Sequence, residues 1–318
     1  MATDARINNT TVGIAFMLAG GVCISINDML IKYLSGDYPL HQMVFIRSAI
    51  AITFSMVFLQ FEGGLAALKS KQLHLHFLRS LLIAITNLTF FAGLAILPLA
   101  QTTTLFFVAP LFITLLSIPF LGEKVGLHRL SAVLVGFLGV IVMMTQGEPS
   151  TGPTYSRWVL LLPVLSALTY SAAQILTRRL GVRSTASAMA IYIQVTLICV
   201  SLCFFLVAGD GRFVAGQDNP VVVFLLREWV WPSSADWPFL ILLGFVSSVV
   251  AYALSQAYRS ADVATVAPFE YIILPLSVFW GWTIFGTLPN ATTTLGILLI
   301  AGSGIYVFAR ERKKPRQE

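Results

Sequence analysis

The sequence divides into ten apolar segments, each long enough to cross a lipid bilayer as a helix. About 20 mostly apolar residues suffice to span about 30 Å of hydrocarbon. Only 11% of the 318 residues are charged, against about 25% in a soluble domain, so most of the surface must face lipid. The sequence therefore predicts an all-α membrane protein with ten transmembrane helices. The segments run over 12–34, 40–60, 77–97, 101–121, 128–146, 158–178, 187–207, 238–258, 264–285 and 292–309.

The basic residues between these segments are distributed unequally. With the N-terminus in the cytoplasm and the segments alternating in direction, 15 Lys and Arg residues fall on the cytoplasmic side and 4 on the outer side. Cytoplasmic loops of membrane proteins carry such an excess, and one segment more or fewer would invert every later loop. We therefore expect both termini in the cytoplasm. The outer residues are Lys32, Arg157, Arg212 and Arg227.

The net charge of +6 is a signal of topology rather than of nucleic-acid binding. Away from the segment ends there is no basic patch with interleaved aromatic residues, so nucleic acid is not an expected partner. The stretch before Val12 lacks the basic region and cleavage site of a signal peptide, so we expect the first segment to be retained.

The two halves of the sequence resemble each other. Gly122 and Gly286 are 164 residues apart, and Gly139 and Gly304 are 165 apart, in similar glycine-containing segments. Each half holds five segments, an odd number, so the second half must enter the membrane from the opposite side. Inverted repeats are the usual architecture of alternating-access transporters, with the site near the midplane between the halves. We expect two inverted five-helix repeats, at 1–148 and 155–310, and a basic cytoplasmic tail at 311–318.

Several short motifs follow one another along these segments. They are Asn27-Asp28 with Lys32, the helix-two Arg47, 97–100 (Leu-Pro-Leu-Ala), 109–112 (Ala-Pro-Leu-Phe), 121–123 (Leu-Gly-Glu), 267–271 (Ala-Pro-Phe-Glu-Tyr), and Gly281-Trp282 followed by Phe285-Gly286. In this order, over about residues 12 to 309, they resemble the drug/metabolite transporter superfamily, of the EamA type with two five-helix repeats.

The resemblance implies a ten-helix transporter in a bacterial inner (plasma) membrane. The Asn-Asp and Pro-Phe-Glu-Tyr motifs are similar to those of members that handle riboflavin or S-adenosylmethionine, and to those of metallophore exporters. Where family members often carry Gly-Glu in the second half, this sequence reads Gly286-Thr287.

Four ionisable side chains lie inside the apolar segments, where they are costly and therefore candidates for function. Asp28 and Lys32 are four residues apart on one helix face and can pair. Arg47, on the next segment, can hold a carboxylate through two parallel hydrogen bonds. Two interpretations stay open: a bridge from Asp28 to Lys32 or Arg47 that locks two helices, or an anionic substrate group bound by Lys32 or Arg47.

The fourth ionisable residue, Glu270, lies near the cytoplasmic start of the ninth segment, where Pro268 loosens the backbone. A buried carboxylate there can exchange a proton or bind a cationic substrate. The alternative is a carboxylate that is hydrogen-bonded to a neighbouring hydroxyl or held in a cytoplasmic vestibule.

Aromatic and polar residues in the middle of several segments suggest a pocket. Aromatic faces with a few polar groups suit a flat heterocycle. The alternative for each residue is a ring facing lipid or a side chain bonded to its own helix. The candidates are Asn87, Phe90, Thr103, Phe107, Tyr170, Gln174, Tyr252, Gln256 and Tyr271.

These features favour a secondary transporter of a small organic metabolite, driven by protons or by exchange. No nucleotide-binding motif is present, and no cofactor is expected. His74 and His76, in the loop before the third segment, have no third ligand nearby, so no metal is expected. A channel, a non-transporting receptor or an integral-membrane enzyme are the alternatives. The expected partners are a small-molecule substrate and membrane lipid, with a homodimer left open.

Overall fold

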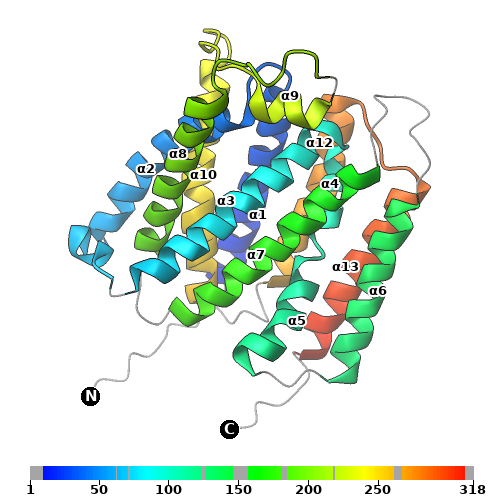
Figure 1. Ribbon diagram of the computed structural model, residues 1–318. Helices are drawn as coiled ribbons and strands as arrows, with labels where there is room; N and C mark the ends of the chain where they lie inside the picture. Colours follow the sequence, from blue (N-terminus) through cyan, green and yellow to red (C-terminus); the bar gives the residue numbers. More distant parts are fainter. Residues whose placement is uncertain are drawn as a thin grey trace.

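All regular structure in the described residues of the computed structural model is helical (Figure 1). These residues are 10–61, 63–70, 72–122, 126–145, 157–180, 185–217, 219–260 and 267–311. The first half contains α1 (Thr10–Leu34), α2 (Leu40–Phe61), η1 (Gly64–Leu68), α3 (Leu73–Ile96), α4 (Leu99–Phe106), α5 (Ala109–Leu121) and α6 (Leu127–Met144). The second half contains η2 (Arg157–Leu160), α7 (Leu161–Leu180), α8 (Ala186–Ala208), α9 (Pro220–Leu226), α10 (Trp237–Ser260), η3 (Ala267–Ile272), α12 (Ile273–Phe285) and α13 (Ala291–Glu311).

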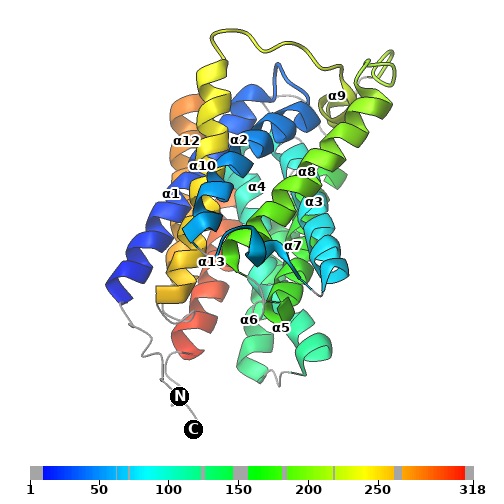
Figure 2. The ribbon, with the colours of Figure 1, turned by 90° about the vertical axis from the view of Figure 1, so that its left-hand side faces the viewer.

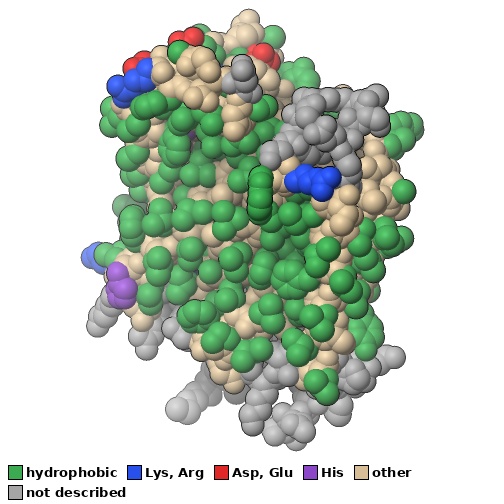
Figure 3. Space-filling model, turned by 45° about the vertical axis from the view of Figure 1, so that its right-hand side comes forward, with side chains coloured by type: hydrophobic (Ala, Val, Ile, Leu, Met, Phe, Trp, Pro, Cys, Tyr) green, Lys and Arg blue, Asp and Glu red, His purple; other side chains and the backbone are tan. Residues whose placement is uncertain are grey.

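Seven helical segments are long and apolar enough to cross a membrane, and they coincide with seven of the ten segments expected from the sequence. Three shorter apolar helices coincide with the other three, at Leu130–Met144, Phe269–Phe285 and Ala291–Tyr306. Hydrophobic side chains cover most of the face seen in Figure 3, and the acidic side chains on this face lie at its upper end. This distribution is that of a bundle surrounded by lipid.

The expected segment over 101–121 is confirmed as an apolar span at Leu99–Phe120, but its helix is interrupted rather than continuous. The helix stops at Phe106 and resumes at Ala109. Pro110 has no N–H for the carbonyl of Phe106 four residues earlier, so the ladder of hydrogen bonds ends there. Pro275 removes the partner of the Tyr271 carbonyl in the same way, at the junction of η3 and α12.

The two helices that follow these breaks are alike. Both α5 and α12 are 13 residues long. Each ends at a glycine in the left-handed conformation, Gly122 with φ 70° and Gly286 with φ 63°. Glycine adopts this conformation without the steric cost that a Cβ atom brings.

The long helices associate in pairs. Extensive contacts join α1 to α10, α3 to α7, α2 to α8 and α6 to α13 (Figures 1 and 2). Small residues bring α6 and α13 together, since a Cβ atom on Gly296 would lie 2.3 Å from the Met143 side chain. The start of α1 and the end of α13 lie at one end of the bundle, and α9 covers the other (Figure 2).

Candidate functional site

Arg47 of α2 joins three helices in the interior. Its side chain is 6% exposed. The guanidinium donates to Asn87 Oδ1 on α3 at 2.8 Å and to Asn27 Oδ1 on α1 at 3.5 Å. It also lies over the ring of Phe91, 5.3 Å from the ring centroid. The amide of Asn87 is oriented by its own bond to the Ile83 carbonyl, which directs the oxygen toward Arg47.

Asp28 is linked to Arg47 in two ways. The two charges attract each other across space, and Asn27 is hydrogen-bonded to both side chains. Oδ1 of Asp28 accepts a bond from Asn27 Nδ2 at 3.1 Å, and Asn27 Oδ1 also accepts from Ser247 of α10 at 3.0 Å. In the part of the chain that the structure describes, Asp28 forms no ion pair with Lys32 or Arg47, so a direct bridge is not observed. Asn27 instead connects the carboxylate to the guanidinium. We call Asn27, Asp28, Arg47 and Asn87 the outer cluster.

Lys32 is directed away from the outer cluster. Its ammonium donates to the carbonyls of Leu94 and Leu97 at the end of α3, at 2.7 Å each. It also lies 5.5 Å from the centroid of the Phe285 ring. The predicted pair with Asp28 is therefore not formed, and Lys32 connects α1 to the end of α3.

A chain of aromatic rings leads from the outer cluster into the bundle. Phe91 meets Phe90 at a centroid distance of 5.3 Å, and Phe90 meets Phe106 at 5.2 Å. Phe106 then meets Tyr170 of α7 at 5.3 Å. Phe106 was not among the residues expected in the pocket, although it precedes the helix break.

A second branch of this chain crosses to the other helix break. Phe107 lies 6.5 Å from Phe106 and 5.1 Å from Tyr271 of η3, measured between ring centroids. Thr103 is one turn earlier on α4, and its buried hydroxyl has no hydrogen-bond partner. The aromatic row is defined as Phe91, Phe90, Phe106, Phe107, Tyr170 and Tyr271.

Polar groups surround the Tyr170 end of the aromatic row. Gln174, one turn further on α7, lies near the Tyr170 hydroxyl. Tyr170 also interacts electrostatically with Glu270 and Arg79, and Glu270 interacts in the same way with Tyr271. The structure thus places Gln174, a pocket candidate, and Glu270, the candidate for proton exchange, near the rings of Tyr170 and Tyr271.

Tyr252 and Gln256 do not join the row. Tyr252 stacks on Phe58 with centroids 4.5 Å apart, and Phe16 meets it edge-on at 6.2 Å. Gln256 is half-buried one turn further along α10. Tyr252 therefore serves the packing of α10 against α1 and α2.

The helix α3 begins at Leu73 rather than at Phe77, so His76, which was expected in the loop before it, belongs to α3. His76 is buried and stacks on Tyr192, with centroids 4.7 Å apart. Arg79 is also buried, and its Nε donates to Thr177 of α7 at 2.6 Å. Its spacing of eight residues from Asn87, two helical turns, is the signal that could have placed it on the inner face.

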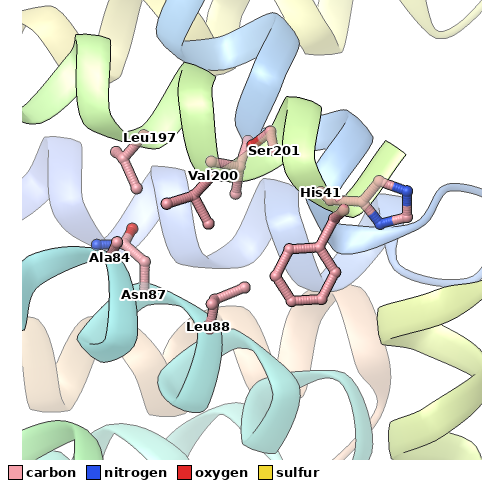
Figure 4. A pocket seen from close by; sticks show the side chains of 9 residues that line it. His41, Ala84, Asn87, Leu88, Leu197, Val200 and Ser201 are labelled. Atoms are coloured by element: carbon pink, nitrogen blue, oxygen red, sulfur yellow. The ribbon is translucent and has the colours of Figure 1, made fainter. Parts of the chain in front are cut away.

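A small cavity lies between α2, α3 and α8 beside Asn87 (Figure 4). Most of the lining is apolar, and Asn87 is the residue that connects it to the outer cluster. The lining residues are His41, Val44, Ala84, Asn87, Leu88, Leu197, Val200, Ser201 and Phe204.

The segment around α9 is fastened over this end of the bundle. Arg227 donates to three carbonyls of the turn between α1 and α2, including that of Tyr38. The Tyr38 hydroxyl donates to Asp236 at 2.7 Å, and Gln42 exchanges two bonds with the backbone of Val230. Burial raises the pKa of Tyr38, and the Asp236 carboxylate adds to this effect, so the hydroxyl keeps its proton and remains a donor.

Known proteins resemble this chain over nearly its whole length. The EamA-like transporter family matches residues 11–145. A riboflavin transporter of Rhizobium johnstonii is 29% identical over 312 residues, covering 98% of this chain and 95% of that protein. An S-adenosylmethionine uptake transporter of Rickettsia prowazekii is 26% identical over 301 residues, covering 95% and 94%. A crystal structure with 17% identity covers 96% of this chain and 98% of its own, with a TM-score of 0.63, and shows a similar fold.

The apolar helices and these similarities define a multi-pass α-helical membrane transporter. Together they support assignment of the chain to the drug/metabolite transporter superfamily, with an EamA-type match over residues 11–145.

Proposed function

We propose that the chain is a secondary transporter that moves a small, flat heterocyclic metabolite across the bacterial inner membrane by alternating access. The observation that carries this proposal is the aromatic row, which runs from the outer cluster to Tyr170 and meets both helix breaks. Aromatic faces bind flat rings by stacking, and broken helices are common at the binding sites of secondary transporters.

The ten apolar segments would all cross the membrane, as two inverted five-helix repeats at 1–148 and 155–310. The helix pairs support this arrangement. If α7, α8 and α10 correspond to α1, α2 and α3, the pair of α1 with α10 exchanges with the pair of α7 with α3. The pairs α2 with α8 and α6 with α13 each map onto themselves, as a two-fold relationship requires.

Two spacings support the same repeat. Pro110 and Pro275, which break corresponding helices, are 165 residues apart, and the terminal glycines Gly122 and Gly286 are 164 apart. Corresponding breaks would lie opposite each other across the site. The carbonyls of Phe106 and Tyr271, which lack an N–H donor four residues later because of Pro110 and Pro275, then become candidates to accept from a substrate's polar edge.

Riboflavin and S-adenosylmethionine are the substrates to test first, because the named relatives handle them and both carry a flat ring system. Glu270 is the coupling candidate, through proton uptake and release, with exchange of substrates as the alternative mode. The site residues proposed are Asp28, Arg47, Asn87, Phe90, Thr103, Phe107, Tyr170, Gln174, Glu270 and Tyr271, together with Phe106.

Topology is tested by labelling single cysteines in a background that lacks Cys23, Cys199 and Cys203. A membrane-impermeant reagent applied to intact cells should label Ala215→Cys, which lies in the segment before α9, and should not label Lys313→Cys in the tail. Labelling of Lys313→Cys from outside, or protection of Ala215→Cys, contradicts ten helices with cytoplasmic termini.

Transport is tested with purified protein in liposomes loaded with unlabelled riboflavin or S-adenosylmethionine. Uptake of labelled substrate should exceed that of empty liposomes. Phe106→Ala should reduce it about tenfold or more, because stacking on one aromatic ring is worth about 1–3 kcal/mol. Phe61→Ala is the matched control, since Phe61 is 85% exposed on the bundle surface. Equal loss in both variants, or no uptake of any flat heterocycle, contradicts the proposal.

A further inference from the structure

Arg79 is a second buried guanidinium, separate from the outer cluster. Its side chain is 9% exposed. Nε donates to Thr177 Oγ1 at 2.6 Å, while Nη1 is buried and has no hydrogen-bond partner among the described residues. Among the residues that the structure describes, Arg79 forms no ion pair. The guanidinium of Arg79 thus lies inside the bundle, with Nε hydrogen-bonded and Nη1 available to another acceptor.

Such an arrangement is costly for a residue that only fills space. A buried charge is stabilised by an opposite charge and by hydrogen bonds, and leaving a donor unpaired costs free energy. Arginine presents its donors in a rigid planar fork that matches the two oxygens of a carboxylate or a phosphate. The open edge of Arg79 therefore has the geometry of an anion-binding group.

Thr177 holds the guanidinium in one orientation. Its hydroxyl donates to the carbonyl of Ala173 at 2.8 Å, which leaves the oxygen lone pairs to accept from Arg79 Nε. Because Nε carries this bond, the N–H groups of Nη1, on the far side of the guanidinium, remain for another acceptor. A residue placed only to carry positive charge at a membrane surface would not need this constraint.

The neighbours of Arg79 connect it to the aromatic row. Tyr170, Gln174 and Thr177 lie at positions i, i+4 and i+7 of α7, on one face of that helix, and α7 packs along α3. Tyr170 interacts electrostatically with Arg79, and its ring meets Phe106 at 5.3 Å. A ring held on the aromatic row can therefore place a charged substituent toward Arg79.

Two other titratable side chains, Glu270 and His76, lie in the neighbourhood of Arg79. Glu270 interacts with Tyr170 but forms no ion pair with Arg79 in the described part of the chain. His76, one turn earlier on α3, interacts with Arg79 electrostatically and stacks on Tyr192. Neither neutralises the guanidinium by direct contact.

We propose that Arg79 is a specificity-determining residue that binds an anionic substituent, a carboxylate or a phosphate, on a ring-bearing substrate. The inference rests on the proposed function, since the ring is bound by the aromatic row. It narrows the substrate class to flat heterocycles that carry an anionic group.

Matched pairs of ligands test this directly, with full-length protein in detergent and binding measured by calorimetry. The pairs share a ring and differ in charge: riboflavin with riboflavin 5′-phosphate, riboflavin with a 10-carboxymethylflavin, and indole with indole-3-acetate. The parent should bind the anionic member about tenfold tighter or more, as expected for hydrogen bonds to a charged group. The phosphate and carboxylate arms identify which anion fits.

Arg79→Gln should abolish this preference and leave the affinity for the neutral ring within about twofold. Arg79→Lys should keep part of the preference, because lysine retains the charge but not the planar fork. Thr177→Val, which removes only the orienting hydroxyl, should weaken the preference severalfold and covers the case in which Arg79→Gln fails to fold. Arg212→Gln is the matched control, since the Arg212 side chain is 56% exposed.

The outcomes separate the two proposals. If neutral rings bind and the anionic group gives no higher affinity, the role of Arg79 is overturned and the proposed function stands. The same conclusion follows if Arg79→Gln and Thr177→Val both keep the preference for the anionic member. If Arg79→Gln lowers membrane insertion and leaves the preference intact, Arg79 is a topology residue, which also overturns the inference. If no member of any pair binds, the proposed function fails and the inference fails with it.

Discussion

The ammonium of Lys32 on α1 donates to the carbonyl oxygen of Leu94 on α3, 2.7 Å away. In a regular helix that carbonyl would accept from the N–H of residue 98, but Pro98 has none. The Leu97 carbonyl beside it receives a second bond from the same ammonium, also at 2.7 Å. The ammonium inside the bundle thus gains two hydrogen-bond acceptors, and the two carbonyls at the end of α3 gain a donor.

Replacing Lys32 by methionine should therefore lower stability more than transport. The loss of two charge-assisted bonds at a buried helix end should reduce the free energy of unfolding by about 1–3 kcal/mol. Thermal unfolding in detergent measures this, and transport per folded molecule should stay near that of the parent. Lys32→Arg should recover part of the stability. A variant with unchanged unfolding temperature and no transport would instead make Lys32 a substrate ligand.

Replacing Arg47 by lysine should impair transport more than expression. Lysine keeps the charge, but a single ammonium cannot reach Asn27 and Asn87 with the planar geometry that the guanidinium provides. Losing one charged hydrogen bond, worth about 1.5–3 kcal/mol, should slow transport about tenfold or more in vesicles matched for protein amount. A rate equal to that of the parent shows that the fork is not required.

Replacing Glu270 by glutamine separates binding from coupling. Glutamine keeps the shape and most hydrogen bonds of the side chain but cannot ionise. We expect the variant to bind substrate and to exchange it between two loaded compartments, but to lose accumulation driven by a pH gradient. Liposomes with and without the gradient provide the comparison. Unchanged accumulation removes the coupling role, and loss of binding as well makes Glu270 a direct ligand of a cationic substrate.

Replacing Gly304 by alanine should disturb the inner side of the aromatic row. A Cβ atom at this position of α13 would lie 1.7 Å from the Tyr271 hydroxyl oxygen, so the tyrosine must move away from Phe107. We expect a loss of about 1–3 kcal/mol in unfolding free energy, as for overpacked cores, with slower transport. Gly302→Ala is the control, because nothing lies within 4 Å of its Cβ position. Equal behaviour of the two variants would contradict the contact.

Several site residues could be anticipated from the sequence because their roles depend on local properties. Arg47 is a charge inside an apolar segment, and Asn87 is a polar residue at the centre of the next one. The structure joins them by a bond of 2.8 Å. Phe90 and Phe107 were expected in a pocket, and both belong to the aromatic row. The break after Phe106 was also encoded locally, since Pro110 lies four residues later, but the apolar pattern of 101–121 concealed it.

Other residues took roles that no local pattern specifies. Lys32 was paired with Asp28 because they are one turn apart, whereas its partners lie 62 and 65 residues away on α3. Tyr252 and Tyr170 are both tyrosines inside apolar segments, yet Tyr252 stacks on Phe58 of α2 and does not join the aromatic row. Arg79 lies within the expected segment 77–97, but only the structure shows that it is buried and bonded to Thr177, 98 residues away on α7.

There is a physical reason why some features follow from the sequence and others only from the tertiary structure. The sequence alone determined which segments are apolar and helical, because the length of an apolar run and the loss of a hydrogen bond at proline depend only on nearby residues. Only the tertiary structure decided which faces meet, because the apolar segments of a membrane protein are similar to one another in hydropathy. Association there depends on close packing and on specific polar contacts rather than on hydrophobicity. The bonds of Arg47 to α1 and α3, and the meeting of Phe107 with Tyr271 across 164 residues, are set at that level.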